Sequence, residues 1–537
     1  HLVMLGFKQY NNNKILTIFT HVFGNFYFTD TKTIHFMFKM MTGRMYMNHH
    51  NGVKPSFSMA LLPIALTLLI LAIQLFVFND FTPHIPLAIG IGITAILAGF
   101  RGYRWHYIEA GVFNALRIAL PSIAILITVG MIVAVWIASG TVPVLIYYGL
   151  KLLSPEYFLA SGMLLCALVS VSLGTSWGTV STIGLALVGI GAGFDIPIYW
   201  TAGAVVSGAF FGDKMSPLSD TTNLAPAVTG VNLFDHIKNM IPTTLPAMLI
   251  ALCIYLFVGF NVVDSKSVDF STINTITKGL ETSFSLSPWL LLPPAIVLFL
   301  SLKRMPSLPS LFAGVIAGAA LAIAVQGFSI HEIFQFMQNG FNIDTGVTDL
   351  DSLLNRGGIQ SMAWVITLVM ISLGFGGALE RTHCLETIIG EILKKTHTFF
   401  GLQAAAMGTA MTTNLVAGDP YLSISLPGRM FASAYIKRGY SKLNLSRAVE
   451  EGGTLISPLI PWNAGGAVVI TSLGLGIGEG NIENLLYIPF AFACWLSPLI
   501  GLIYAATGRF SPKLSHAEQE QENTETEQTE TMEPIKA

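Results

Sequence analysis

The stretch Phe211-Gly212-Asp213-Lys214-Met215-Ser216-Pro217-Leu218-Ser219-Asp220 places charged residues and a proline inside a strongly apolar part of the chain. A second stretch, Gly452-Gly453-Thr454-Leu455-Ile456-Ser457-Pro458-Leu459-Ile460-Pro461, resembles it at a separation of 458 − 217 = 241 residues. A duplicated apolar chain with Gly/Pro-interrupted segments at matching positions is typical of secondary transporters, whose site lies where the broken segments meet. The same offset relates four further pairs: Thr141/Thr382, Gly149/Gly390, Phe158/Phe399 and Gly212/Gly453.

The composition excludes several classes of protein. Charged residues make up 11% of the chain and hydrophobic residues 53%, whereas soluble domains carry roughly 25% charge. The sequence therefore predicts an all-α polytopic membrane protein whose main partner is the lipid bilayer. A net charge of −2 argues against nucleic-acid binding. The four cysteines stand singly without C-x-x-C spacing, so we expect neither a disulfide framework nor a thiolate metal site.

Crossing the hydrocarbon core takes about 20 apolar residues. Two regions, 157–230 and 398–475, are too long for one span and are interrupted by polar and Gly/Pro clusters. We expect each region to form a helical hairpin, 157–193 or 398–436, followed by a broken helix, 196–230 or 439–475. Simple spans are expected at 59–78, 84–100, 119–139, 242–260, 287–302, 307–326, 359–379 and 485–506.

The distribution of lysine and arginine predicts the orientation, because cytoplasmic loops retain these residues. The alternation that places most of them inside puts both termini in the cytoplasm, the loop 140–156 outside and its counterpart 380–397 inside. The two repeats are therefore predicted to be inverted. The residues placed inside are Arg101, Arg104, Arg117, Lys238, Lys303, Arg304, Arg381, Lys394, Lys395, Lys437, Arg438, Lys442, Arg447, Arg509 and Lys513.

The chain divides by composition into five parts. A leader at 1–58 includes a segment, 1–46, that we expect not to be native, with Met47 as the natural start. An acidic tail rich in glutamate is expected to be a disordered cytoplasmic segment. The predicted parts are the leader 1–58, the first transmembrane repeat 59–260, an external linker 261–286, the second inverted repeat 287–510 and the tail 511–537.

The first repeat carries the strongest candidate site. Thr175 and Ser176 stand at the expected hairpin tip, where hydroxyls and freed carbonyls offer the oxygen ligands that a hard cation such as Na⁺ prefers. Close helix packing is the alternative use of such small residues. Asp213 and Asp220 lie at membrane depth, where an ionisable residue is a functional candidate. The remaining candidates from this repeat are Ser216, Thr221, Thr222 and Asn223.

Asp220 is the preferred ion-binding residue, because no basic residue stands within four positions of it. Lys214 could instead neutralise Asp213 as a structural pair. A buried carboxylate can hold Na⁺ or H⁺ but not both, since burial favours the protonated form and a bound cation favours the charged form. This competition is the logic of ion/proton exchange.

The second repeat offers a matching set of polar residues: Thr413, Asn414, Asp419, Glu450, Glu451 and Asn463. Glu450 and Glu451 lie near Arg447, so a solvated salt bridge competes with a role in proton entry. Arg429 either pairs with one of these acids or contacts an anionic substrate. The sequence leaves these alternatives open.

Several motifs are missing from the chain. It contains no G-x-x-x-x-G-K-[ST], so nothing suggests that ATP drives it, and no H-E-x-x-H zinc motif. We therefore expect no enzyme activity and no cofactor, with Na⁺ and H⁺ as the transported species. The only partners expected are the bilayer and small ions, with a homodimer as an open alternative.

Two motifs together resemble the signature of the NhaC-type sodium/proton antiporters: Gly174-Thr175-Ser176-Trp177-Gly178-Thr179, and Gly212-Asp213-Lys214-Met215-Ser216-Pro217-Leu218-Ser219-Asp220-Thr221-Thr222-Asn223. The resemblance covers essentially residues 59 to 510. It implies an inverted-repeat transporter that exchanges cytoplasmic Na⁺ for external H⁺ across a bacterial plasma membrane, for pH and sodium homeostasis. The family also includes relatives that exchange malate and protons for lactate and Na⁺. The motif residues with a matching position are Asp213, Ser216, Asp220, Thr221, Thr222 and Asn223.

Sodium/proton exchange at Asp220, with Asp213, Thr175, Ser176 and Thr221, is thus the function that the sequence favours. A malate/lactate antiporter is the alternative, with Arg429 and half-helix N-termini binding the organic anion. A channel or a non-transporting membrane sensor is the alternative from another class. A channel is disfavoured because channels assemble symmetric pores, whereas these breaks lie within one chain.

Overall fold

The structure is a computed structural model that describes residues 52–78, 82–261, 270–303, 305–476 and 482–514. Within these ranges every regular element is a helix, and the one β-bridge joins Tyr440 to Lys513. The all-α prediction is confirmed. The predictions made for Met47, for the segment 1–46 and for most of the acidic tail lie outside the described residues.

The described helices include seven that are long and apolar enough to cross a membrane, or up to ten if each bent pair counts as one span. Helix α5 extends well beyond its predicted span of 119–139, to 34 residues, with Pro121 inside it. The helices at the predicted simple spans are α3 (Phe57–Phe76), α4 (His84–Gly99), α5 (Trp105–Ala138), α12 (Leu233–Asn261), α14 (Leu292–Leu302), α15 (Ser307–Ala324), α18 (Gly358–Arg381) and α25 (Phe492–Thr507).

Two predicted loops are short helices. The loop expected at 140–156 holds α6 (Thr141–Leu152), and the loop expected at 380–397 holds α19 (Cys384–Lys395). A buried apolar face on each, including Ile146 on α6 and Ile389 on α19, packs against neighbouring helices. The other connecting elements are α13 (Phe270–Ser283), η3 (Pro288–Leu291), α16 (Ile330–Asn339), α17 (Thr348–Leu354), η5 (Ile482–Leu486) and α24 (Tyr487–Phe490).

The first predicted hairpin is present. Its first arm is α7 (Pro155–Leu173), which ends at Gly174 in the left-handed conformation with φ 68°. Only glycine fits there, since an added Cβ would lie 2.7 Å from the carbonyl carbon of Leu218. The second arm runs through α8 (Ser176–Thr179), a π-helical turn η2 (Val180–Gly184) and α9 (Leu185–Gly193).

The second hairpin has the same form. Its arms are α20 (Phe399–Ala417) and α21 (Pro420–Lys437), and Gly418 at the tip has φ 62°. The two broken helices also occur as predicted. They are α10 (Ile198–Met215) with α11 (Asp220–Thr229), and α22 (Lys442–Gly453) with η4 (Ser457–Leu459) and α23 (Ala464–Leu473).

The structure corrects the alignment of the two halves. The left-handed glycines at the hairpin tips are separated by 418 − 174 = 244 residues, not 241. The same offset relates the helix-capping residues Thr175/Asp419 and Ser219/Asn463, and the terminal glycines Gly230/Gly474. Pro217 therefore corresponds to Pro461, and the repeated Ser-Pro-Leu triplet that suggested 241 is a local coincidence.

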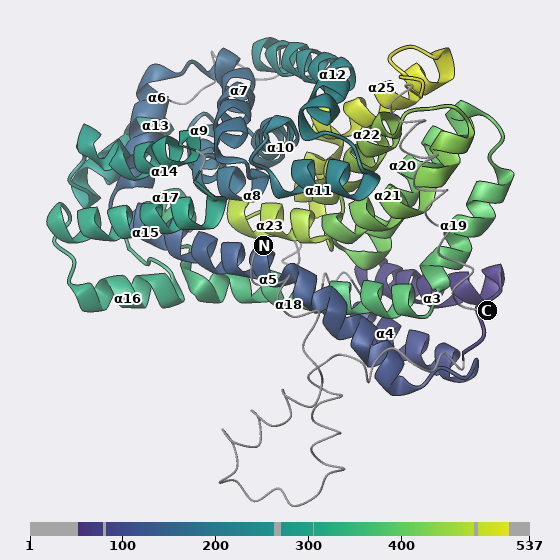
Figure 1. Cartoon of the computed structure of the whole chain (residues 1–537). Coiled ribbons are helices and arrows are strands. Elements are labelled where there is room, and N and C mark those ends of the chain that lie inside the picture. The colour runs from purple at the N-terminus through teal and green to yellow at the C-terminus, as the bar shows by residue number, and fades with distance from the viewer. Residues whose placement is uncertain (1–51, 79–81, 262–269, 304, 477–481, 515–537) are drawn as a thin grey trace, which may run out of the picture. The chain divides into compact units, whose positions relative to one another are not determined.

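The two halves also pack reciprocally. Helix α4 of the first half packs on α18 of the second, and α15 of the second half packs on α5 of the first. Near the middle of Figure 1, the short helix α8 of the first hairpin meets α10 and the half-helix α23. Opposite orientation of the two halves in the bilayer stays a prediction.

Candidate ion-binding site

The first hairpin tip places Ser176 against the broken helix. Thr175 is the N-cap of α8, and its hydroxyl accepts a hydrogen bond from the Gly178 amide at 3.3 Å. Because Thr175 caps the helix, the next residue is free for another contact. The Ser176 hydroxyl donates to Oδ2 of Asp213 at 2.7 Å, and only 7% of Asp213 is exposed.

Three of the predicted site residues bond backbone carbonyls at or beside the break between α10 and α11. The Thr222 hydroxyl donates to the carbonyls of Asp213 and Lys214, both at 3.0 Å. The Asn223 amide donates to the Pro217 carbonyl at 2.9 Å. The Ser216 hydroxyl donates to the Val171 carbonyl at 2.7 Å. These side chains satisfy backbone groups near the break, and none of the three is among the residues that line the pocket, so they support the site without facing it.

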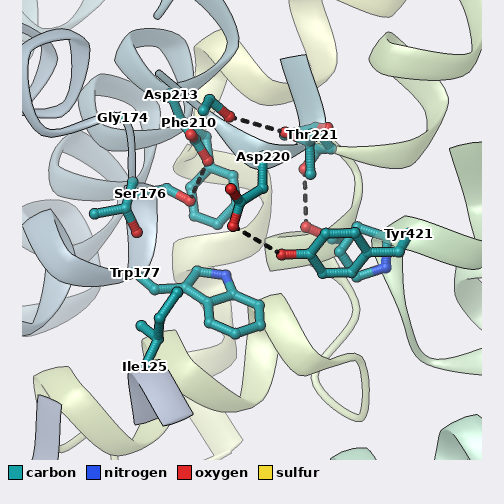
Figure 2. Close-up of a pocket in the computed structure, with 14 residues that line it drawn as sticks. Ile125, Gly174, Ser176, Trp177, Phe210, Asp213, Asp220, Thr221 and Tyr421 are labelled. Carbon is teal, nitrogen blue, oxygen red and sulfur yellow. Dashed lines mark hydrogen bonds between the residues drawn. The ribbon is translucent and has the colours of Figure 1, made fainter. Parts of the chain in front are cut away.

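A pocket lies between the first hairpin tip, the break and the second hairpin tip. In Figure 2 the carboxylates of Asp213 and Asp220 point into it, with Trp177 on one side and Tyr421 across from Asp220. The Tyr421 hydroxyl donates to Oδ2 of Asp220 at 3.5 Å. The lining residues are Ile125, Gly174, Thr175, Ser176, Trp177, Phe210, Asp213, Ser219, Asp220, Thr221, Pro420, Tyr421, Thr454 and Ser457.

The two carboxylates occupy different positions. Asp213 is buried at the inner wall, whereas Asp220 is exposed and stands at the mouth. Asp220 is also the first residue of α11, where the positive end of the helix dipole favours a carboxylate. An ion that enters the pocket would meet Asp220 first and Asp213 last.

The chemistry of the pocket suits a small cation. Two carboxylates and several hydroxyls line it, and no lysine or arginine is among its lining residues. Such oxygen groups are the ligands that hard cations prefer. The cavity volume is about 40 Å³, which corresponds to roughly three water-sized particles. No group of three or more histidine, cysteine, aspartate or glutamate side chains suited to a metal ion occurs in the described ranges.

None of the six second-repeat candidates is among the residues that line the pocket. Asp419 is the N-cap of α21, where its carboxylate accepts from the Leu422 amide at 3.0 Å. The Asn414 amide donates to the Gly452 carbonyl at 2.8 Å and accepts from Asn463 at 2.9 Å. The Thr413 hydroxyl donates within its own helix. Asn414 and Asn463 hold the second break as Ser216, Thr222 and Asn223 hold the first.

The charged candidates pair differently from the alternatives that the sequence left open. Lys214 does not pair with Asp213, because its ammonium lies 3.3 Å from Oε1 of Glu451. Glu450 and Glu451 are fully buried, so neither forms a solvated salt bridge. Arg429 forms an ion pair with Glu380 at 3.3 Å, and its side chain is 58% exposed.

Sequence reasoning missed several pocket residues. Trp177 and Tyr421 are corresponding residues at the offset of 244, and so are Asp213 and Ser457, and all four line the pocket. The correct alignment would have drawn attention to Tyr421 and Ser457. Thr454 and Phe210 carried no signal of their own, because an isolated threonine or phenylalanine in an apolar region is ordinary.

Comparison with known proteins places this chain in a family. The Na⁺/H⁺ antiporter family model matches residues 208–509. The Na⁺/H⁺ antiporter NhaC of Alkalihalophilus pseudofirmus is 40% identical over 85% of this chain and 96% of its own. The arginine/ornithine antiporter ArcD of Halobacterium salinarum is 36% identical over 87% and 95%, respectively. The malate-2H⁺/Na⁺-lactate antiporter of Bacillus subtilis is 33% identical over 82% and 94%. This chain belongs to the Na⁺/H⁺ antiporter family.

Proposed function

We propose that this protein exchanges Na⁺ for H⁺ across a membrane by secondary active transport. The observation that carries the proposal is the pocket itself, a small space with two carboxylates, several hydroxyls and no cationic side chain among its lining residues. Its family supports the same activity, since the relative at 40% identity is named a Na⁺/H⁺ antiporter. We further propose a bacterial plasma membrane, cytoplasmic termini, and export of Na⁺ against entry of external H⁺ for pH and sodium homeostasis.

Competition at one carboxylate would couple the two ions. Asp213 is buried, and its charge is stabilised by the hydroxyls of Ser176 and Ser219 and by any cation that binds in the pocket. A bound Na⁺ favours the ionised carboxylate, and loss of Na⁺ favours its protonation. Na⁺ and H⁺ are then carried in alternation by a site that opens to each side in turn.

We propose Asp213 rather than Asp220 as the carboxylate that exchanges Na⁺ for H⁺. The sequence favours Asp220 because no base stands near it, but the side chain lies at the mouth and bonds Tyr421. Desolvation is what makes a carboxylate choose between Na⁺ and H⁺, and Asp213 is the more buried of the two. We therefore assign the exchange step to Asp213 and capture of the incoming cation to Asp220.

Exchange of an organic substrate is the second candidate, because two of the relatives bear such names. The pocket offers an organic anion no cationic partner, since no lysine or arginine is among its lining residues. Arg429, the cation that the sequence offered for an organic anion, pairs with Glu380 and does not line the pocket.

Purified protein in proteoliposomes with an acidic interior would test the proposal, with lumenal pH followed by a fluorescent dye. Addition of NaCl alone should dissipate the gradient, and protein-free liposomes give the background. Separate additions of malate, lactate and arginine as their choline or chloride salts test the organic substrates. A response that requires an organic substrate, with none to NaCl alone, would contradict the proposal.

A further inference from the structure

A second group of side chains, five ionisable residues and one serine, lies behind the ion pocket, fully buried between helices α10, α12, α22 and α25. We name it the inner network. Every member has 0% of its surface exposed. Its members are Lys214, His236, Arg447, Glu450, Glu451 and Ser497.

The inner network touches the pocket through hydroxyl groups. The Thr454 hydroxyl donates to Oε1 of Glu450 at 2.8 Å, and Thr454 is a lining residue of the pocket. The side chain of Thr221, another lining residue, also lies beside the Glu450 carboxylate. Glu450 therefore stands one hydroxyl away from the space that Asp213 faces.

The middle of the inner network bridges the two halves of the chain. The Lys214 ammonium donates to Oε1 of Glu451 at 3.3 Å and to the Ser497 hydroxyl at 3.2 Å. Lys214 follows Asp213 in the sequence, and Glu451 follows Glu450. Each half thus contributes one acid close to the pocket and one neighbouring charge to the network. The Lys214 charge also acts on Glu450, Arg447 and His236.

The far end of the inner network approaches the surface. The Arg447 guanidinium donates through Nη1 to the Phe510 carbonyl at 2.9 Å and to the Asn239 carbonyl at 3.3 Å. The side chain of Phe510 is 55% exposed. His236, near the start of α12, shares a hydrogen bond of 2.6 Å with Ser446 of α22. The polar groups therefore extend from the pocket to this end of α12, α22 and α25, with some neighbours joined by hydrogen bonds and others by their charges alone.

The inner network also contains unusual unpartnered atoms. Within the described ranges, five of its buried polar atoms have no hydrogen-bond partner: Oε2 of Glu450, Oε2 of Glu451, Nε and Nη2 of Arg447, and Nε2 of His236. Buried polar groups are normally bonded to protein or to ordered water. A purely structural ion pair would satisfy its own atoms, because an unpaired buried charge is strongly destabilising. Donors and acceptors that both stay open suit a path along which water and protons pass.

We propose that the inner network is the proton route of the exchanger, separate from the mouth at Asp220 through which Na⁺ passes. The proposal rests on the proposed Na⁺/H⁺ exchange. A proton released by Asp213 passes through the pocket hydroxyls or water to the Glu450 carboxylate, and from there along the network to its surface end. The reverse transfer reloads Asp213. Each transfer moves one proton between oxygen or nitrogen atoms of these groups or of water, so no other reactant is needed, and the Arg447 guanidinium keeps its charge throughout.

Two exchange modes of the same protein separate the proton route from the Na⁺ site. Proteoliposomes are assayed for ²²Na⁺/Na⁺ exchange, which needs no proton transfer, and for ²²Na⁺ uptake driven by a pH gradient. Glu450→Gln should lower the proton-driven rate by roughly 100-fold, the contribution of a positioned proton-transfer group. It should leave ²²Na⁺/Na⁺ exchange within about twofold, since exchange without proton transfer does not use the group. Asp419→Asn is the matched control, a buried acid outside the network, and should affect neither mode.

Thr454→Val is the second variant, because it removes the hydroxyl between Glu450 and the pocket while nearly keeping its shape. It should slow proton-driven uptake more than ²²Na⁺/Na⁺ exchange, which it also weakens because Thr454 lines the pocket. Glu450→Asp should restore part of the rate that Glu450→Gln loses. Equal loss of both modes in folded Glu450→Gln and Thr454→Val proteins, or no loss in either, would overturn the proton route. Failure of wild-type protein to transport Na⁺ in either mode would instead contradict the proposed function.

Discussion

The two hairpin tips have the same backbone and different chemistry. Gly174 and Gly418 are both left-handed, and the next residue caps the following helix in each case, Thr175 at one tip and Asp419 at the other. At the first tip the capping residue is followed by Ser176, which reaches Asp213. At the second tip it is followed by Pro420, which has no polar side chain. The first tip therefore donates a serine hydroxyl to Asp213, whereas the second tip donates the phenolic hydroxyl of Tyr421 to Asp220.

This difference shows how two halves with similar hairpins can take different roles. At the second tip, the capping bond to the Leu422 amide uses the Asp419 carboxylate, so this buried acid is structural. The corresponding break positions diverge as well, since Asp213 corresponds to Ser457 and Asp220 to Ala464. The first half thus supplies the charge of the pocket, and the second half closes it with Tyr421, Thr454 and Ser457.

Exchanging each buried acid for its amide is the sharpest test of this comparison. Asp213→Asn should abolish Na⁺-dependent proton flux. Removal of one partner of a buried charge pair typically costs about 3–5 kcal/mol, which corresponds to a loss of affinity of more than ~100-fold. Asp419→Asn should retain flux, because asparagine caps helices as well as aspartate. Equal loss in both variants, measured as apparent Na⁺ affinity in proteoliposomes, would remove the distinction between the tips.

Ser176→Ala should weaken Na⁺ binding by about tenfold, because a hydrogen bond to a charged group contributes about 1.5 kcal/mol or more. Ser423→Ala on the second hairpin is the control, since its hydroxyl bonds the Asp419 carbonyl within the same helix. Apparent Na⁺ affinity should change in the first variant and not in the second. Unchanged affinity in Ser176→Ala would show that the Asp213 contact does not matter for binding.

Asp220→Asn should have a smaller effect than Asp213→Asn. An exposed charge contributes about 1 kcal/mol or less, so we expect a decrease of up to about fivefold in apparent Na⁺ affinity. The effect should shrink at high ionic strength, because salt screens exposed charges. A complete loss of exchange in this variant, as the sequence preference for Asp220 implies, would reverse the two assignments.

Arg429→Gln should produce the smallest change. Its pair with Glu380 is exposed, and exposed ion pairs contribute about 0–1 kcal/mol. Na⁺/H⁺ exchange should therefore stay within about twofold of wild type, and the melting temperature should hardly move. Strong loss of transport in this variant would revive an organic anion as substrate.

The sequence predicts the architecture well because its signals are local. Apolar length gives most of the spans, and Gly/Pro interruptions give the hairpins and breaks that the structure contains. Helices α4 and α14, of 16 and 11 residues, are shorter than a full span. The sequence could not predict the roles of individual polar residues, since Asp213 and Asp419 look alike as acids beside a helix break. Their difference depends on which amide or hydroxyl each carboxylate meets, Leu422 for one and Ser176 for the other. The pairing of Lys214 with Glu451 was hidden for the same reason, since 237 residues separate the partners.

Proton release on Na⁺ binding tests the central claim most directly. Purified protein in weakly buffered detergent solution is titrated with NaCl while a pH dye reports free protons, with choline chloride as the control for ionic strength. The account predicts that wild-type protein releases protons as Na⁺ binds and that Asp213→Asn releases none. Na⁺ binding without proton release in wild type, or undiminished release in Asp213→Asn, would contradict competition of the two ions at Asp213.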